Sequence, residues 1–258
     1  MEKRINFYRL LFIFFLLGVL HVNAQQTTIQ SAPLAGSDDG YFVVYGKGMV
    51  MFGKSAPGSN GRIPYNRING SPFLIQEYQN AEVFDAKGSL GIMPCKINYY
   101  SQELYFRNNI GEERVAEQGV VTKVVFKPLQ GAAAESVFQT GIPVEKIKNT
   151  APDKDNYVQI LNQGKFQLLK YGAMQFIVAD SLMGSAKRYY FSYQTAYYLS
   201  KGVPQSPVKL RKLSRDAILD ELKSVSGMEL WLREQKINFK KEEDVIRFLD
   251  WYNQQPQN

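Results

Sequence analysis

The sequence predicts a mainly β protein of the α+β class, an antiparallel β-meander or sandwich-like sheet followed by a C-terminal segment of short helices. As far as about residue 210, apolar and polar residues alternate with a period of two between turn signals, as in strands with one buried face. Beyond that point, apolar residues recur at helical spacing. We therefore expect a signal peptide over 1–24, an antiparallel β-rich domain over 25–210, and helices over 211–258 packed on that domain.

The first 24 residues have the three parts of a secretory signal peptide. Lys3, Arg4 and Arg9 give a positive start, an apolar run covers 10–20, and the small residue Ala24 precedes a cleavage point at Gln25. The apolar run of 11 residues is shorter than the roughly 20 that a helix needs to cross a bilayer. We expect cleavage and export to the periplasm, the outer membrane or the medium, with no transmembrane span in the mature chain.

Cleavage removes the only histidine, His21. The mature chain then lacks the imidazole that Ser-His-Asp and Cys-His catalysis and histidine metal sites require. The single cysteine, Cys95, lies on an apolar strand pattern, so we expect a buried and unreactive thiol. The sequence thus indicates no catalytic residue, no metal site and no cofactor.

Turn signals divide the β-rich region into strands. Residues 85–88 and 108–111 each place Asp or Asn first and Gly fourth, which is typical of hairpin turns. Between them, Cys95, Ile97 and Tyr99 share one strand face. Further strands are expected at 104–107, 119–126, 156–162, 165–171, 174–178, 187–198 and 207–213, with Gln163-Gly164 as a tight hairpin.

Three short helices are expected at the C-terminal end. Ser214 is placed to cap the first helix, and Ser226 and Glu229 have the spacing of a capping box for the second. A third helix has one apolar and one polar side. Its apolar side carries Val245, Phe248, Leu249 and Tyr252, and the other side carries Glu242, Glu243 and Arg247. Helices this short are unstable alone, so they should pack on one another or on the sheet.

The mature chain carries a net charge of +5, since 3 of 31 basic and 1 of 24 acidic residues leave with the signal. Basic residues are dispersed apart from Lys209, Arg211, Lys212 and Arg215, so we expect no nucleic-acid binding. We interpret this cluster as a solvated strand-to-helix junction. Contact with an anionic glycolipid or polysaccharide is the alternative.

Residues 48–55 match the G-x-x-x-x-G-K-[ST] pattern of a phosphate-binding loop. That loop must lead into a helix, whereas 56–61 is rich in Gly, Pro and Ser and typical of a loop. The residues between the two glycines are large and apolar, as in a strand. We therefore interpret the match as a glycine-flanked strand and expect no nucleotide binding.

The most aromatic stretch is 187–198, KRYYFSYQTAYY. On a strand, Tyr189, Phe191, Tyr193 and Tyr197 share a face that suits a core, whereas Tyr190 and Tyr198 lie on the mixed face. Tyrosine combines an apolar ring with a polar tip. Tyr190 and Tyr198 are therefore the candidate ligand-binding residues, as a stacking platform for sugar rings or a partner protein, and burial in the core is the alternative.

Three stretches resemble exported proteins of unassigned function that are common in Bacteroidota: Gly70 to Leu74 with the strand and turn that follow, 96–100, and 231–252. The resemblance is patchy. It implies a Gram-negative envelope or secreted setting and no established activity.

These observations favour an exported, non-enzymatic binding or structural component of the bacterial cell envelope, with an envelope protein or polysaccharide as partner. The alternative is a carboxylate-dependent hydrolase acting on envelope polysaccharide, which needs two acids about 5 to 10 Å apart across a sugar. Adjacent acids such as Asp38-Asp39 or Glu112-Glu113 do not establish that geometry.

Overall fold

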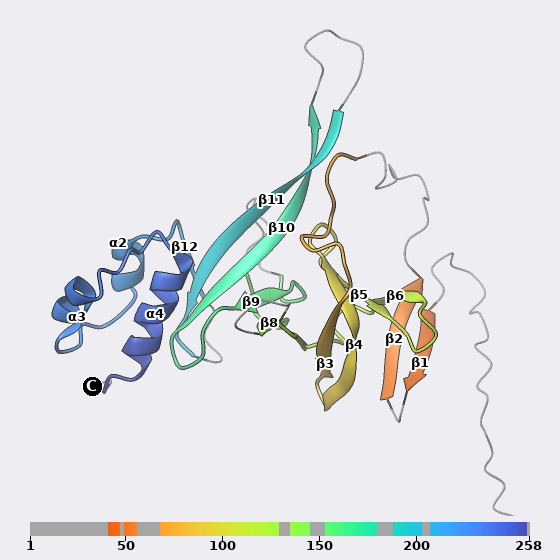
Figure 1. The fold of residues 1–258 in the computed structure, drawn as a ribbon, viewed down its shortest axis with the longest axis horizontal. Helices are drawn as coiled ribbons and strands as arrows, with labels where there is room; N and C mark the ends of the chain where they lie inside the picture. Colours follow the sequence, from red (N-terminus) through yellow and green to blue (C-terminus); the bar gives the residue numbers. More distant parts are fainter. Residues whose placement is uncertain are drawn as a thin grey trace, which may run out of the picture. The chain divides into compact units, whose positions relative to one another are not determined.

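The computed structural model describes residues 41–46, 49–55, 68–128, 135–144, 153–179, 188–202 and 207–256, with the backbone alone described for 41–55. The protein is mainly β, with an antiparallel sheet followed by short helices, which confirms the predicted fold class (Figure 1). The predicted signal peptide, residues 1–24, lies outside the described residues, as do Asp38 and Asp39.

The strands are β1 (Tyr41–Gly46), β2 (Met49–Ser55), β3 (Gln79–Asp85), β4 (Gly88–Asn98), β5 (Glu103–Arg107), β6 (Glu113–Ala116), β7 (Lys123–Phe126), β8 (Ser136–Gln139), β9 (Val158–Ile160), β10 (Gln167–Ala179), β11 (Arg188–Ser200) and β12 (Val208–Leu210). The helices are α2 (Arg215–Leu219), α3 (Met228–Glu234) and α4 (Glu242–Asn253). The strands lie in the order β1-β2-β6-β5-β4-β3-β7-β8-β9-β10-β11-β12. The meander therefore comes in two runs, β3 to β6 and β7 to β12, joined where β3 pairs with β7.

Side-chain caps fix both predicted hairpin turns. The carboxylate of Asp85 accepts hydrogen bonds from the backbone N–H groups of Lys87 and Gly88, at 2.7 and 2.9 Å. The amide oxygen of Asn108 accepts from the N–H groups of Ile110 and Glu112, at 3.1 and 2.9 Å. These bonds replace backbone pairing where the chain reverses, which is why Asp and Asn lead such turns.

The apparent phosphate-loop motif is strand over the part that the structure describes. Lys54 and Ser55 are the last residues of β2, and Lys54 pairs with Tyr41 on one side and Val115 on the other. The interpretation of the motif as a strand is confirmed. The absence of nucleotide binding stays a prediction.

One continuous strand, β10, replaces the two strands expected at 165–171 and 174–178. Gly172 continues the strand instead of breaking it. A Cβ there would lie 2.5 Å from the hydroxyl of Tyr193 and 3.0 Å from the ring of Tyr99. These two rings pack edge to face, with centroids 5.6 Å apart, directly over the glycine. The glycine thus serves close packing, not a turn.

The connection between β9 and β10 is wider than the predicted tight hairpin. Leu161 N–H still bonds Leu168 C=O, but the side chain of Asn162 accepts from Leu168 N–H at 2.7 Å and donates to Phe166 C=O at 3.0 Å. The side chain of Asn253, at the end of α4, also clasps the backbone of Phe166, accepting from its N–H at 2.8 Å and donating to its C=O at 2.9 Å. Two side chains therefore take the place of ladder hydrogen bonds around this loop.

The three helices begin in different ways. Ser214 caps α2 by accepting from the N–H of Ala217, as predicted. The predicted capping box of Ser226 and Glu229 does not form, because Gly227, at φ 78°, is the residue that precedes α3 and no side chain caps that helix. The positive φ is a conformation that glycine adopts readily. None of the described helices has the length and apolarity needed to cross a bilayer.

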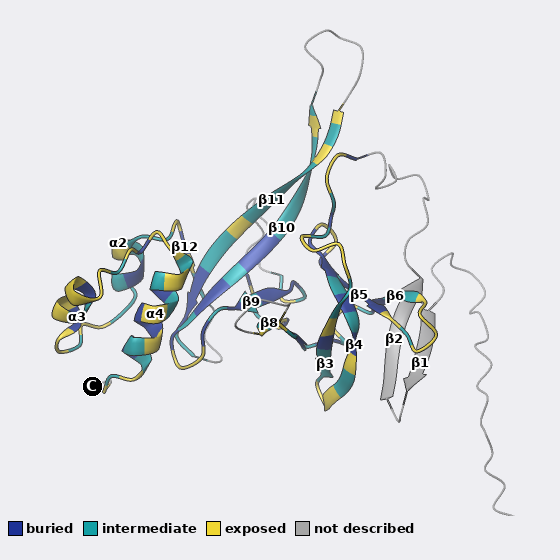
Figure 2. Ribbon diagram, in the orientation of Figure 1, coloured by how far each residue is buried: buried dark blue, intermediate teal, exposed yellow. Residues whose placement is uncertain are grey.

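Apolar clusters cover both faces of β10 and β11 over their inner part, residues 167–171 and 196–200. Figure 2 shows this part of the two strands as largely buried. On one face, Leu168 and Leu199 pack with the helices, whose predicted apolar stripe is fully buried. On the other face, Leu169 and Tyr198 pack with residues of β9 and the chain before it. A separate cluster lies on β3, β4, β5 and β7, and Met174 and Tyr193 pack against it. The stripe consists of Val245, Phe248, Leu249 and Tyr252, each at 0% exposure.

Candidate functional site

The segment 70–78, which precedes β3 and is called the strap below, is held to the sheet by rings and a lysine. Phe73 meets the ring of Tyr105 edge to face, with centroids 5.2 Å apart. The Lys96 ammonium lies 4.3 Å from the ring centre of Phe73 and 4.4 Å from that of Tyr78, and it pairs with the Glu113 carboxylate at 3.2 Å. The Tyr78 hydroxyl donates to the same carboxylate. These contacts anchor the strap at Phe73 and Tyr78, on either side of residues 74–77.

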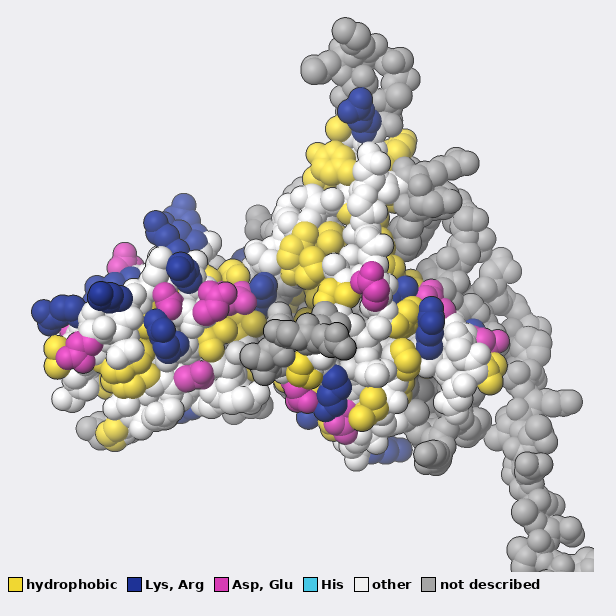
Figure 3. Space-filling view, viewed as in Figure 1, with side chains coloured by type: hydrophobic (Ala, Val, Ile, Leu, Met, Phe, Trp, Pro, Cys, Tyr) yellow, Lys and Arg dark blue, Asp and Glu magenta, His cyan; other side chains and the backbone are white. Residues whose placement is uncertain are grey.

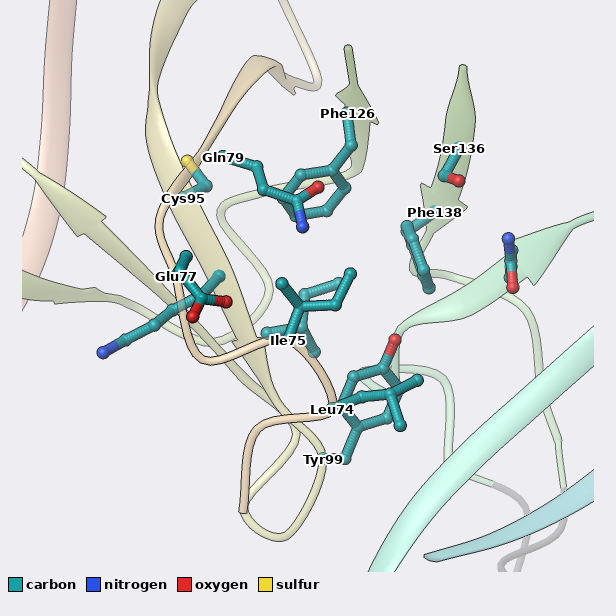
Figure 4. Close-up of a pocket in the computed structure, with 12 residues that line it drawn as sticks. Leu74, Ile75, Glu77, Gln79, Cys95, Tyr99, Phe126, Ser136 and Phe138 are labelled. Atoms are coloured by element: carbon teal, nitrogen blue, oxygen red, sulfur yellow. The ribbon is translucent and has the colours of Figure 1, made fainter. Parts of the chain in front are cut away.

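A pocket of about 140 Å³ lies between the strap and the sheet (Figure 4). Its apolar wall comes from buried side chains of β4, β7 and β8 and the residue after β4: Cys95, Ile97, Phe126, Phe138 and Tyr99. The strap adds Leu74 and Ile75, which are 50% and 42% exposed. Figure 4 shows Ile75 in the middle of the pocket, with the ring of Phe126 pointing toward it. The pocket is thus an apolar hollow of which one wall is open to solvent.

A few polar groups also line the pocket: Glu77, Gln79, Lys96, Ser136 and Gln159. They offer amide, hydroxyl and charged groups beside an apolar floor, as is common in small-molecule sites. Glu77 is the only carboxylate among the described residues of this lining. The wall and these groups can hold a small apolar moiety and orient a polar one attached to it.

Cys95 is buried at 0% exposure and has no disulfide partner, as predicted. Burial raises the pKa of its thiol well above the usual range. The thiol is therefore neutral at physiological pH and is not activated as a nucleophile. Its contribution to the pocket is apolar surface.

The two candidate tyrosines lie in different surroundings. Tyr198 is 1% exposed and opposite Leu169, whereas Tyr190 is 37% exposed and opposite Ile177. They are eight residues apart on one strand, or roughly 26 Å at 3.3 Å per residue. The structure thus does not bring them together as one stacking platform. Tyr198 is core and only Tyr190 presents its ring to solvent.

The pocket could not be predicted from the sequence, because its wall comes from four separate segments of the chain. One signal was available. Leu74 and Ile75 are adjacent apolar residues after Gly70 and Pro72, in a stretch with no strand or helix period. Adjacent apolar residues outside a regular element are either exposed or packed against another part of the protein. This pair, on the strap, lies over Phe126 and Phe138 and covers the pocket.

No protein-family model, curated protein or solved structure matches this chain.

Proposed function

We propose that this chain is an exported, non-enzymatic binding component of the bacterial cell envelope and that the pocket under the strap holds the apolar part of its ligand. The supporting observation is the apolar wall of buried rings that Leu74 and Ile75 complete while half-exposed. A ligand that covers these two side chains would remove them from water. This would stabilise the complex by roughly 25 cal/mol for each Å² of apolar surface covered.

The size of the pocket limits what enters it. An apolar cavity of about 150 Å³ accommodates benzene. The pocket beneath the strap, at about 140 Å³, therefore suits one aromatic ring or a short alkyl group. The single carboxylate among the described lining residues supports binding over glycoside hydrolysis, for which two acids must flank the sugar. The ligand's polar part would face Glu77, Gln79 or Gln159.

Binding can be tested by titrating the mature protein with p-cresol and with butyramide while following methyl and aromatic NMR signals. Shifts should concentrate on Ile75, Ile97 and Phe138. Ile75→Ala removes three carbons and should weaken the affinity by up to roughly sixtyfold, because about 0.8 kcal/mol is lost for each carbon no longer buried against the ligand. Ile92→Ala is the matched control, since Ile92 is 62% exposed and lies outside the lining.

Equal effects of the two substitutions would contradict the pocket assignment. Release of reducing ends from envelope polysaccharide by the purified protein would instead support the hydrolase alternative. Export is tested separately by intact-mass measurement of the protein from its host's envelope, where a chain beginning at Gln25 is expected. Full-length protein retained in the inner membrane would contradict it.

A further inference from the structure

A second hollow lies where β11 and β12 meet the helices, separate from the pocket under the strap. It is an open groove of about 720 Å³. Figure 3 shows several Lys and Arg side chains near β12 and the helices, with Asp and Glu side chains among them. The lining consists of Thr195, Ala196, Tyr197, Lys209, Leu210, Arg211, Lys212, Leu213 and Lys240. Four of these residues are cations, and no acid is among the described residues of the lining.

The cations that line the groove are not the same set as the basic cluster in the sequence, which consists of Lys209, Arg211, Lys212 and Arg215. Arg215 is withdrawn from it, because its guanidinium binds both carboxylate oxygens of Glu229, at 2.6 and 2.7 Å. Lys240 joins it from the loop before α4, 28 residues beyond Lys212 in the chain. Among the described residues, no carboxylate lies within ion-pair distance of Arg211, Lys212 or Lys240. Three exposed cations thus converge without an acidic partner on the described part of the chain.

Two acids lie near Tyr197, which lines the groove. Glu242 is already bound by the Lys170 ammonium at 2.8 Å and by the Tyr197 hydroxyl at 2.7 Å. Glu243, exposed at the start of α4, is the other carboxylate that acts on Tyr197. Arg211, Lys212 and Lys240 outnumber these two acids, of which Glu242 is already bound by Lys170. The groove therefore keeps a positive field toward solvent.

The cations are carried on anchored backbone. Leu210 pairs with Tyr197 in the sheet and, at 5% exposure, is part of the helical core, so Arg211 and Lys212 leave from a fixed strand end. Lys240 follows the buried Phe239, and its N–H donates to the side chain of Asn238 at 3.1 Å. A preorganised site loses less entropy on binding than a flexible tail.

We propose that this basic groove binds the phosphate of a phosphorylated sugar, free or as the headgroup of a glycolipid. Arg211 can hold two phosphate oxygens at once, and the lysines supply point charges around the others. The exposed hydroxyl of Thr195 and the half-buried ring of Tyr197 adjoin the cations and offer the hydrogen bonding and apolar face that a sugar ring uses. The inference is independent of the pocket under the strap.

Isothermal titration with glucose 1-phosphate, beside glucose, is the first test. Binding should require the phosphate and weaken as salt rises. The double variant Arg211→Gln/Lys212→Gln should lose roughly tenfold or more in affinity, because hydrogen bonds to charged groups are lost. The matched control is Arg233→Gln/Lys87→Gln, which removes the same charge from exposed residues outside the groove and should bind like the parent. Ile75→Ala should also bind like the parent.

Vesicles distinguish the two sources of phosphate. Flotation with phosphatidylcholine vesicles containing a monophosphorylated glycolipid, beside phosphatidylcholine vesicles alone, should show retention that the groove variant loses if the ligand is lipid-linked. Binding of glucose 1-phosphate without such retention assigns a soluble ligand. The proposal is overturned if neither probe binds, if the groove and control variants weaken equally, or if a DNA duplex binds more tightly than either probe. Unchanged far-UV circular dichroism of both variants excludes misfolding as the cause.

Discussion

The β10–β11 hairpin has an inner half, residues 167–172 with 195–200, and an outer half, residues 173–179 with 188–194. The two halves share one pairing register and a similar supply of apolar side chains, yet they differ in burial. In the inner half, Leu168, Tyr198 and Leu199 are at most 1% exposed. In the outer half, Val178 is 47% exposed and Tyr190 is 37% exposed. Figure 2 shows this change along the two strands. Strand pairing alone therefore does not make a core.

The difference comes from what covers each half. The helices and the chain before β9 pack on opposite faces of the inner half. The outer half has less cover: Met174 and Tyr193, next to Gly172, pack against the cluster on β3, β4, β5 and β7, and farther out Phe191 meets the ring of Tyr100 and Tyr190 bridges Asn69. Phe176 and Tyr189 stack on each other within the hairpin, with centroids 5.7 Å apart. Contacts between rings on one face leave their other sides in water. Stability should accordingly be concentrated in the inner half, and the outer half should open at lower free energy.

The largest expected effect removes part of the cover. Phe248→Ala should lower the free energy of unfolding by about 3–5 kcal/mol, since the ring is 0% exposed and lies in the helical core with Leu168 and Leu199. Arg247→Ala is the control, because its ion pair with Asp244 is half-exposed and contributes about 1 kcal/mol or less. Denaturant unfolding of both variants beside the parent measures this. Small, similar losses would mean that the helices do not stabilise the inner half.

A direct comparison uses one aliphatic residue from each half. Leu168→Ala should cost about 2–5 kcal/mol, through lost burial and the cavity left behind. Val178→Ala should change the free energy of unfolding by about 0.5 kcal/mol or less, because nearly half of that side chain already faces solvent. Urea titrations of the two variants give both values. A larger loss for Val178→Ala would reverse the comparison.

Gly172 lies at the boundary between the halves. Gly172→Ala should cost about 1–3 kcal/mol by overpacking, because the new methyl would lie 2.5 Å from the Tyr193 hydroxyl. Adding Tyr193→Phe removes that oxygen, so the double variant should recover part of the loss. Thermal unfolding of the single and double variants checks this coupling. A double variant that is less stable than Gly172→Ala would show that the hydroxyl contact is not the source of strain.

The smallest effect at neutral pH concerns Tyr171, also in the inner half. Burial, with the nearby Asp153 adding to it, raises the pKa of Tyr171 to about 12, against about 10 in an unfolded chain. The folded state thus keeps its proton more tightly, so the free energy of unfolding should be constant below about pH 10 and fall as the pH rises toward 12. Tyr171→Phe should fall less steeply over that range in denaturant titrations. Parallel curves for parent and variant would contradict this.

Features that depend on residues close together in the sequence could be predicted from it. The Ser214 cap, the Asp85 and Asn108 turns and the apolar stripe of α4 all depend on neighbours within a few residues. Gly172 could not be read this way, because its role depends on Tyr99, 73 residues earlier in the chain. Tyr190 and Tyr198 have the same residue type and strand face, so periodicity could not separate them. The pocket and the basic groove likewise depend on tertiary packing.

The clasp of Asn253 on Phe166 has a consequence for the order in which the fold is completed. The side-chain amide acts as a short substitute strand, and Gly164 leaves room for it, since a Cβ there would lie 2.6 Å from the Asn253 amide nitrogen. The two partners are 87 residues apart, so their contact closes a long loop. Closing that loop costs conformational entropy, and we expect the contact to form late in folding. A ribosome delivers β10 and β11 well before it delivers Asn253. The face of the hairpin that carries Leu168 and Leu199 therefore lacks the cover of α4 until that helix has been made.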